Sequence, residues 1–423
     1  MIEADLAVTG IAELATAQGN GPKVGRDLGR LLIVEEAAIA AREGRIVFVG
    51  TQREYHEAVA LVPGGRTIDA AGGTVLPGFV DAHTHLPFAG WREREFDERL
   101  RGATYSEIAA RGGGILSTVE AIRAIDETRL ARDVRGRLDE MLRLGTTTVE
   151  GKSGYGLSRS GEMKQLRALA AAASGHAIEV VPTFLGAHTV PREYRERRQA
   201  YIDLIVDEML PAVASERLAE YADAFVDAQA FTRDEARRVL VAAREHGMGA
   251  RLHADQLADD GTAALAAELG AVSADHLDHA SDAGIEALAR AGTCGVLLPA
   301  AALFLLAERR PPGRRLVDAG VPVVVATDFN PGTCPTESMG AALWSACLIA
   351  GLTVDEAITA ATLNAAYALG RGTSVGSLDP GKRANLVVHA VPNRYHLVYR
   401  LGVPRIDKVI VDGRLVYERP TAA

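Results

Sequence analysis

The sequence is poor in cysteine, has no excess of positive charge and contains no apolar run long enough to span a bilayer. Its three cysteines, Cys294, Cys334 and Cys347, show no C-x-x-C spacing, which predicts free thiols in a reducing compartment. The net charge of −9 argues against nucleic acid or an acidic membrane surface as a partner.

The ends and the apolar segments of the chain give no sign of export or membrane insertion. The N-terminus lacks the basic start and apolar run of a signal peptide. The most apolar window, residues 294–307, is too short for a transmembrane helix and contains Pro299. It is better explained as a buried strand followed by a loop, and we expect a soluble, cytoplasmic protein.

The sequence does contain a repeated alternation of strand-like and helical patterns. Eight strand-like runs occur between residue 77 and about 328, at 78–85, 146–151, 178–187, 223–228, 248–253, 271–276, 294–299 and 321–328. Amphipathic helical segments between them include 134–144, 163–173, 233–246 and 261–269. Eight consecutive strand–helix units favour an α/β fold of the (β/α)8 TIM-like barrel type over an open sheet.

Both ends of the chain differ from this central part. Short strand-like pieces bounded by glycines, such as 44–50 and 408–413, occur before and after it. They predict a small β-sandwich domain built from both termini, residues 1–76 plus 380–423, beside a barrel domain of residues 77–379.

The stretch from Leu76 to Leu86 is the most informative in the chain, because a short buried strand is predicted to end in His83 and His85. Side chains two residues apart on a strand point to the same side, so both imidazoles can reach one ion. Zinc accepts imidazole nitrogen readily. An isolated H-x-H pair would more often be two ordinary histidines, so the predicted metal site depends on further ligands downstream.

The ends of the other strand-like runs supply such ligands. In a (β/α)8 barrel the active site lies at the C-terminal ends of the strands. Most of the eight runs finish in or just before an ionisable residue, and these residues are His83, His85, Lys152, His188, His253, His276 and Asp328. Their convergence predicts an active site more strongly than any one of them does.

Each residue taken singly also has a structural explanation. His253 fits a core histidine bonded to a carbonyl, and Asp328 fits a turn, since Asp-x-Asn-Pro-Gly is typical of turns. Lys152 and Tyr155 fit a flexible glycine loop, and Arg92 fits a solvated charged loop. Histidines left outside the predicted site include His176, His246, His279, His389 and His396.

Several motifs give the chain a resemblance to a known family. The run P-G-F-V-D-A-H-T-H with a late strand-end aspartate resembles the amidohydrolase superfamily of metal-dependent barrel enzymes. Further motifs resemble the imidazolonepropionase family within it: GGGILST at 112–118, KSGYG at 152–156, FLGAH at 184–188, HADQ at 253–256, DHL at 275–277 and ATDFNPG at 326–332. The likeness runs in order from about residue 40 to beyond 380.

The resemblance implies hydrolytic ring opening of 4-imidazolone-5-propanoate to N-formimidoyl-L-glutamate in histidine degradation, with a small anionic substrate and a homodimeric enzyme. It implies one divalent ion, zinc or iron, held by His83, His85, His253 and Asp328. It implies proton transfer or carbonyl polarisation by His276. The positions that match substrate-binding residues of the family are Arg92, Tyr155, His188, Gln256, Asn330, Gly332 and Thr333.

The residue types suit this reaction. A metal ion lowers the pKa of a bound water from about 15.7 toward roughly 7, and Asp328 can accept the proton of that water. His276 can polarise the ring carbonyl, and either residue can return a proton to the departing ring nitrogen. The propionate arm of the substrate requires a cation in an otherwise acidic protein, and the planar guanidinium of Arg92 suits a carboxylate.

Two positions depart from the family pattern. Gln256 stands where some relatives carry glutamate, and an amide cannot exchange a proton as an acid does. Acid–base chemistry therefore falls to His276 and Asp328. Gly151 stands where many relatives have cysteine, and we expect little consequence.

Three alternatives remain open. A carbamylated Lys152 can bridge two ions, with His188 and His276 as further ligands. The same fold and metal also serve deaminases of nucleobases or related heterocycles, which would not require Arg92. A non-catalytic scaffold would typically lose metal ligands, whereas all four are present here. Imidazole and carboxylate ligands suit zinc and iron alike.

Overall fold

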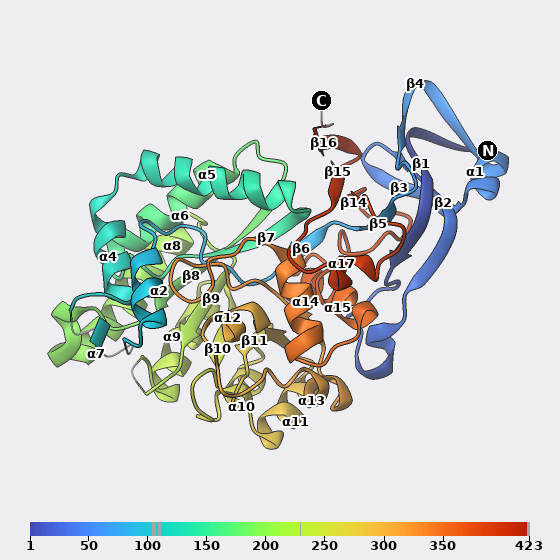
Figure 1. Cartoon of the computed structure of the whole chain (residues 1–423). Helices are drawn as coiled ribbons and strands as arrows, with labels where there is room; N and C mark the ends of the chain where they lie inside the picture. The colour runs from blue at the N-terminus through green and yellow to red at the C-terminus, as the bar shows by residue number, and fades with distance from the viewer. Residues whose placement is uncertain (104–106, 109–110, 229, 421–423) are drawn as a thin grey trace.

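The larger part of the molecule is a parallel sheet curled into a barrel with helices on its outside (Figure 1). The computed structural model describes residues 1–103, 107–108, 111–228 and 230–420. The strands follow one another in sequence order around the barrel: β6 (Phe79–Asp81), β7 (Thr146–Lys152), β8 (Glu179–Ala187), β9 (Tyr221–Phe225), β10 (Gly249–Ala254), β11 (Ser273–His276), β12 (Cys294–Leu297) and β13 (Val323–Val325). All eight predicted strands are present, and the TIM-like barrel is confirmed.

The barrel closes where the segments after β6 and β13 meet. Thr84 and Phe329 form an isolated parallel bridge, and the Asp328 N–H donates to the His83 carbonyl at 3.1 Å. The predicted strand at 78–85 is too long, because regular pairing of β6 ends at Asp81. The bridge at Thr84 nevertheless keeps the backbone extended there, so the side chains on either side of Thr84 point the same way.

Helices cover the outside of the barrel. They are α2 (Glu93–Leu100), α4 (Ile115–Ala124), α5 (Glu127–Arg143), α6 (Arg159–Ala173), η2 (Arg192–Arg197), α7 (Arg198–Leu204), η3 (Ile205–Met209), α8 (Leu210–Ser215), α9 (Arg233–Glu245), α10 (Thr262–Glu268), α11 (Asp282–Ala291), α12 (Pro299–Phe304), α13 (Gly313–Asp318), α14 (Met339–Ile349), α15 (Val354–Ala360) and α16 (Leu363–Ala368).

Helix α5 begins two turns earlier than the predicted segment at 134–144. Its first two turns, residues 127–133, consist mainly of charged and polar residues, and Leu130 is the one buried residue among them. The helical spacing of apolar residues is therefore not visible in this part of the sequence. The Asp126 side chain caps the helix by accepting a hydrogen bond from the Arg129 N–H at 2.8 Å. The cap residue, rather than the apolar pattern, marks the start of this helix.

A second sheet is built from both ends of the chain, and it contains the first and the last strand, β1 and β16 (Figure 1). Its order is β16-β15-β14-β5-β1-β2-β3, with β4 paired to β1. Its elements are β1 (Ile2–Thr16), η1 (Gly25–Gly29), β2 (Leu32–Arg42), β3 (Arg45–Thr51), α1 (Gln52–Ala58), β4 (Val59–Asp69), β5 (Thr74–Pro77), β14 (Leu386–His389), α17 (His396–Tyr399), β15 (Ile406–Val411) and β16 (Arg414–Glu418).

The strands of this second sheet form one connected mixed sheet, and residues of both its halves share one apolar cluster. This confirms the predicted β-domain assembled from both termini. The boundaries at 77 and 380 stay a prediction, and residues 421–423 of the predicted domain lie outside the described residues.

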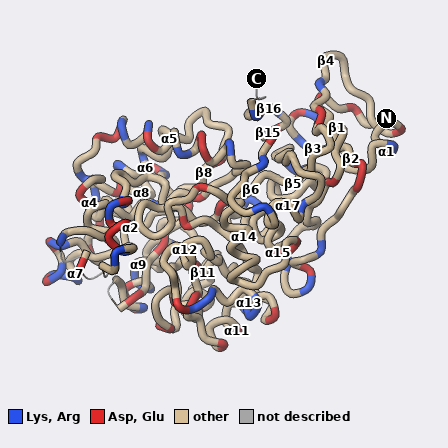
Figure 2. Tube along the Cα trace, in the orientation of Figure 1, with Lys and Arg blue, Asp and Glu red and all other residues tan. Residues whose placement is uncertain are grey.

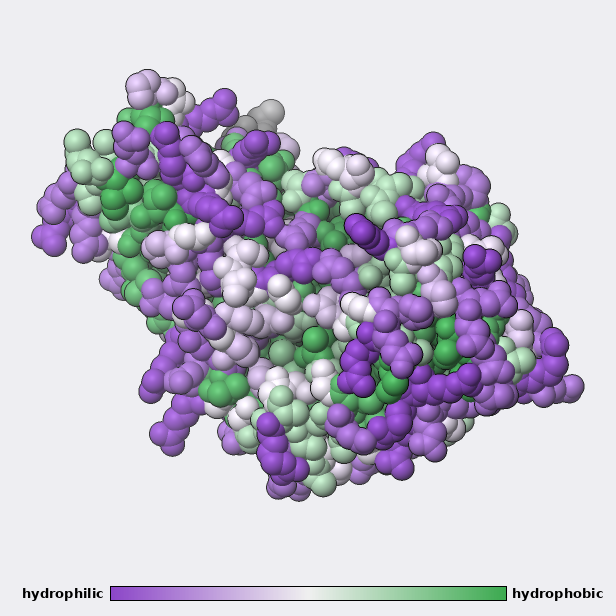
Figure 3. All heavy atoms as spheres, turned by 180° about the vertical axis from the view of Figure 1, so that it is seen from behind, coloured by the Kyte–Doolittle hydropathy of each residue, from purple (hydrophilic) through white to green (hydrophobic). Residues whose placement is uncertain are grey.

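The distribution of charged and apolar residues agrees with what the composition predicts, namely no excess of positive charge and no membrane-spanning segment. Basic and acidic residues are interspersed along outer helices such as α5 (Figure 2). On the face opposite to that of Figure 1, hydrophilic side chains cover most of the surface and apolar groups gather in separate patches (Figure 3). No described helix combines the length and the apolar character needed to cross a membrane. The three cysteines are free, as predicted.

Candidate metal centre

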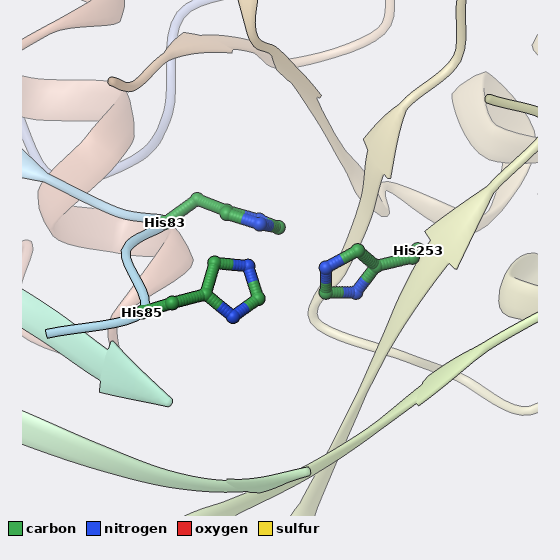
Figure 4. Close-up of side chains that lie close together, drawn as sticks. All are labelled: His83, His85 and His253. Atoms are coloured by element: carbon green, nitrogen blue, oxygen red, sulfur yellow. The ribbon is translucent and has the colours of Figure 1, made fainter. Parts of the chain in front are cut away.

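Three histidines from two parts of the barrel face one another at its C-terminal end (Figure 4). His83 and His85 follow β6, and His253 lies in β10. The ring centroid of His83 lies 5.3 Å from that of His85 and 4.6 Å from that of His253. All three are buried, and one nitrogen of each lies within 4.8 Å of the others. This confirms that the H-x-H pair meets a third imidazole.

The carboxylate of Asp328 completes the group. Its Oδ1 atom lies 3.5 Å from Nε2 of His83 and 3.5 Å from Nε2 of His85. A tetrahedral ion with bonds of about 2.0–2.2 Å to nitrogen and oxygen holds its ligand atoms about 3.4 Å apart. Nε2 of His83 and Nε2 of His253 are buried with no hydrogen-bond partner among the described residues. Unpaired buried imidazole nitrogens next to a carboxylate fit a metal ion.

Two further carboxylates stand behind these histidines, one behind His83 and one behind His253. Asp275 Oδ2 lies 2.7 Å from Nδ1 of His83, and Asp223 Oδ2 lies 3.1 Å from Nδ1 of His253. At His83 this contact is a hydrogen bond, and a carboxylate bonded to Nδ1 holds the ring proton there and leaves Nε2 free to bind a metal. At His253 the contact with Asp223 is an ion-pair distance without hydrogen-bond geometry. Strand register brings these carboxylates to the site, because Asp275 is level with His253 across β10 and β11, and Asp223 is level with Arg251 across β9 and β10.

A buried ion network supports these two carboxylates. The Lys152 ammonium lies 2.6 Å from Glu150 Oε1, 2.8 Å from Asp223 Oδ2 and 3.6 Å from Asp275 Oδ2. Arg251 lies 3.4 Å from Glu150 and 3.5 Å from Asp275. Although burial lowers the pKa of Lys152, Asp223 and Glu150 outweigh that effect and raise it. Lys152 is therefore a fixed cation.

Lys152 was predicted from its place at a strand end, whereas the residues around it were not predicted. Glu150, Asp223, Arg251 and Asp275 all lie in barrel strands and are fully buried. A usable signal was present, because Glu150 and Lys152 stand two residues apart in a run predicted to be buried. A charge in such a strand requires a partner on a neighbouring strand.

His276 and Asp328 lie at neighbouring positions on the rim, both with left-handed backbone. Their φ angles are +76° and +60°, a region that residues other than glycine seldom occupy and that clusters at functional sites. The His276 ring lies 5.4 Å from that of His83. Burial lowers the pKa of His276 to about 3, so this imidazole is neutral near pH 7. Burial also raises the pKa of Asp328.

The glycine loop after β7 is fixed rather than flexible. Glu162 accepts hydrogen bonds from the backbone N–H groups of Gly154 and Leu157, and Gln165 accepts them from Tyr155 and Gly156, at 2.7–3.0 Å. Both acceptors lie on α6, directly after the loop. The loop therefore holds Tyr155 in a buried position at the site.

His188 packs between this loop and the histidine cluster. Its Nδ1 lies 3.0 Å from the Gly154 carbonyl, and its ring stacks on that of His85 at 5.2 Å and 18°. Tyr155 lies 5.3 Å from His188, ring to ring. Gly154 has a φ of +111°, and a side chain there would meet the Leu185 carbonyl and the His188 ring. Only glycine allows this contact.

Arg92 lies at the mouth of the barrel and is largely buried, so the solvated-loop explanation is wrong. Its Nε and Nη2 donate to Glu95 Oε2 at 2.8 and 2.7 Å. Its guanidinium rests against Gly332, where a Cβ atom would overlap it. Glu95 was missed by the sequence analysis. It also accepts from the Gly114 N–H at 3.1 Å, and so joins Arg92 to the G-G-G motif.

The remaining predicted substrate residues differ in what they contact. The Asn330 amide donates to the Asp328 carbonyl and to Thr333 Oγ1, and accepts from the N–H groups of Gly332 and Thr333. Its hydrogen-bonding capacity is filled within the turn, so a ligand would have to displace one of these bonds. Gln256 is half-buried after β10 and forms no side-chain hydrogen bond to another described residue.

Comparison with known proteins places the chain among metal-dependent hydrolases. The amidohydrolase family model matches residues 74–416. The chain is 50% identical over 415 residues to an imidazolonepropionase of Symbiobacterium thermophilum, covering 98% of this chain and 97% of that protein. It is 46% identical over 407 residues to an imidazolonepropionase of Geobacillus kaustophilus, covering 96% of each.

Solved structures with the same fold are more distant in sequence. An adenosine deaminase from Xanthomonas campestris with bound zinc gives a TM-score of 0.72 at 20% identity, covering 98% of this chain and 93% of that one. A 5-methylcytosine deaminase from Klebsiella pneumoniae gives a TM-score of 0.73 at 19% identity, covering 99% and 98%. These likenesses concern the fold alone.

Proposed function

The chain belongs to the amidohydrolase family and, within it, to the imidazolonepropionases, and from this membership we propose how its residues open 4-imidazolone-5-propanoate to N-formimidoyl-L-glutamate. The reaction is hydrolysis of a carbon–nitrogen bond in a cyclic amide. The observation that carries the proposed mechanism is the meeting of three buried imidazoles and one carboxylate at the barrel mouth.

The centre takes a divalent metal ion, and we assign its ligands to His83, His85, His253 and Asp328. The ion, zinc or iron, would supply hydroxide from water at neutral pH. Lys152 argues for a single ion. Its ammonium contacts three carboxylates, and carbamylation would place a fourth negative charge among them.

The chain's own acid and base groups complete the reaction. Asp328, whose pKa is raised by burial, accepts the proton of the attacking water. His276 is neutral and donates a hydrogen bond to the ring carbonyl oxygen, where negative charge develops as the carbon–oxygen bond forms. When the carbon–nitrogen bond breaks, the proton held by Asp328 passes to the departing ring nitrogen.

The propionate arm of the substrate is held by Arg92. Two of its nitrogen atoms are engaged by Glu95, which fixes the guanidinium plane, while the Nη1 side faces Gly332. A planar guanidinium in a fixed orientation suits a carboxylate. Tyr155 and His188 form the adjoining wall and restrict the substrate to a flat ring.

The test supplies freshly made imidazolone propionate to the zinc- or iron-loaded protein and follows the loss of its ultraviolet absorbance. The wild type should consume the compound, and His253→Ala should abolish turnover. His246→Ala is the matched control, because His246 is exposed at the end of α9, and it should retain full activity. Failure of the loaded wild type, or ammonia release from a nucleobase instead, would overturn the proposal.

A further inference from the structure

A separate pocket of about 310 Å³ lies between the barrel and the second sheet. Its walls come from the start of β6, from α14, from the end of β14, from α17 and from the segment that leads into β15. Phe79 lines it at the first residue of β6, whereas His83 lies beyond the last residue of that strand. The interdomain pocket is therefore at the opposite end of the barrel from the metal centre.

The charge of the interdomain pocket is opposite to that of the chain. The chain has 55 acidic and 46 basic residues, yet no Asp or Glu is found among the described residues that line the pocket. Two arginines, Arg400 and Arg405, line it instead, and the imidazoles of His389 and His396 add hydrogen-bonding groups to the same wall. The Arg405 Nε group is buried and has no hydrogen-bond partner within the described part of the chain. This wall is built to attract negative charge.

His389 supplies an independent sign of a missing partner. Its side chain is 1% exposed, and neither ring nitrogen has a hydrogen-bond partner among the residues described. Nδ1 of His396, in the same wall, is also buried and unpartnered. A buried polar group without a hydrogen bond costs roughly 1–3 kcal/mol, so native proteins rarely leave several such groups around one cavity.

We propose that the interdomain pocket binds a small organic anion with a flat apolar body. Arg405, His389 and His396 meet its carboxylate or phosphate group, and Trp344 and Phe79 provide the apolar wall for its body. The volume lies at the lower end of the range of about 300–1,000 Å³ that small-molecule sites span. Ordered water, at about 30 Å³ a molecule, is a competing occupant of such a cavity. This site does not depend on the proposed reaction.

The test titrates the metal-loaded full chain with benzoate, phenyl phosphate and inorganic phosphate by isothermal titration calorimetry. We expect benzoate or phenyl phosphate to bind one to one with a Kd below about 1 mM. Which of the two binds more tightly distinguishes a carboxylate site from a phosphate site. Arg405→Gln and His389→Phe should each weaken binding by about tenfold or more, since the first removes the charged donor and the second removes the imidazole donor.

Two controls separate this pocket from other anion sites. Arg290→Gln removes an exposed arginine of α11, and Arg92→Gln removes the arginine assigned to the substrate; neither should change the affinity. Binding of neither organic probe, or of inorganic phosphate alone, would overturn the proposal. Binding that survives Arg405→Gln but disappears in Arg92→Gln would also overturn it, because the anion would then occupy the metal-centre mouth.

Discussion

Replacing Asp275 with asparagine tests whether the carboxylates behind the histidines position the metal ligands. Asp275 Oδ2 lies 2.7 Å from Nδ1 of His83, and both side chains are fully buried. The carboxylate can only accept a hydrogen bond, so it keeps the ring proton on Nδ1 and leaves Nε2 for the metal. The NH2 group of asparagine can donate to Nδ1 instead, which would move the ring proton to Nε2 and block ligation.

The expected losses of metal affinity and of stability follow from the residues that Asp275 contacts. Loss of a carboxylate that orients a metal-bound histidine typically lowers metal affinity about 10- to 100-fold, which is about 1.4–2.7 kcal/mol. Asp275 also lies 3.5 Å from Arg251 and 3.6 Å from Lys152. After the substitution, these two cations still form ion pairs with the buried carboxylates of Glu150 and Asp223. The metal-free fold should therefore lose less than the about 3–5 kcal/mol typical of an unpaired buried charge.

The assay is zinc competition against a chromophoric chelator at pH 7, combined with thermal unfolding of the metal-free and loaded forms. Asp255→Asn is the matched control. The Asp255 carboxylate is buried too, but it caps α10 by accepting from the Thr262 and Ala263 N–H groups at 2.9 and 3.0 Å. That control should lower the Tm of both forms equally. If Asp275→Asn keeps its zinc affinity within about twofold and behaves in the same way, the positioning argument is refuted.

Four further substitutions give separate expectations. Gly332→Ala places a Cβ atom on the Arg92 guanidinium. KM should therefore rise about tenfold, while the free energy of unfolding changes by less than about 0.5 kcal/mol. Unchanged steady-state kinetics would contradict this expectation. Arg92→Lys keeps the charge but loses the planar group, and KM should again rise with metal content intact by elemental analysis. His276→Asn should lower kcat by about 100- to 10,000-fold without changing metal content. Burial lowers the pKa of His389 to about 3, so between pH 3 and about pH 6.5 only the unfolded chain binds a proton at this imidazole. The free energy of unfolding therefore falls by up to about 1.4 kcal/mol per pH unit as the pH drops. Urea unfolding at pH 7 and pH 5 should show a smaller loss of stability for His389→Leu than for the wild type.

The barrel strands and the ring of strand-end residues could be predicted from sequence because both are properties of single segments. An apolar run that finishes in a polar residue indicates a buried strand whose end reaches the barrel mouth. His253 and Asp328 were predicted on that basis, and the structure places them together. The pairs behind them could not be predicted in this way. That His253 stands beside Asp275 depends on the register between β10 and β11, which no single strand specifies.

Local chemistry explains where the predictions were wrong in extent or incomplete. Regular pairing of β6 ends at Asp81, and beyond it the chain meets the segment after β13 through an isolated bridge at Thr84 rather than a continuous ladder. The glycines of the loop after β7 suggested flexibility, yet Glu162 and Gln165 on the next helix bind its backbone N–H groups. Helical acceptors that lie five to ten residues away in sequence are not visible in the glycine spacing. The Asn330 side chain likewise stays within its own turn.

The charges buried around the metal centre explain why this site would favour a divalent cation. Among the described residues, Glu150, Asp223 and Asp275 contact two fixed cations, Lys152 and Arg251. Asp328 adds a fourth carboxylate, whose recorded ion-pair contacts are to His83 and His85. Two formal negative charges therefore remain uncompensated in a region shielded from water, where such an excess is costly. A divalent ion at the free imidazole nitrogens would neutralise it, whereas a monovalent ion would leave part of it in place. The network is thus more than a support for the ligands, because its charge selects the charge of the ion.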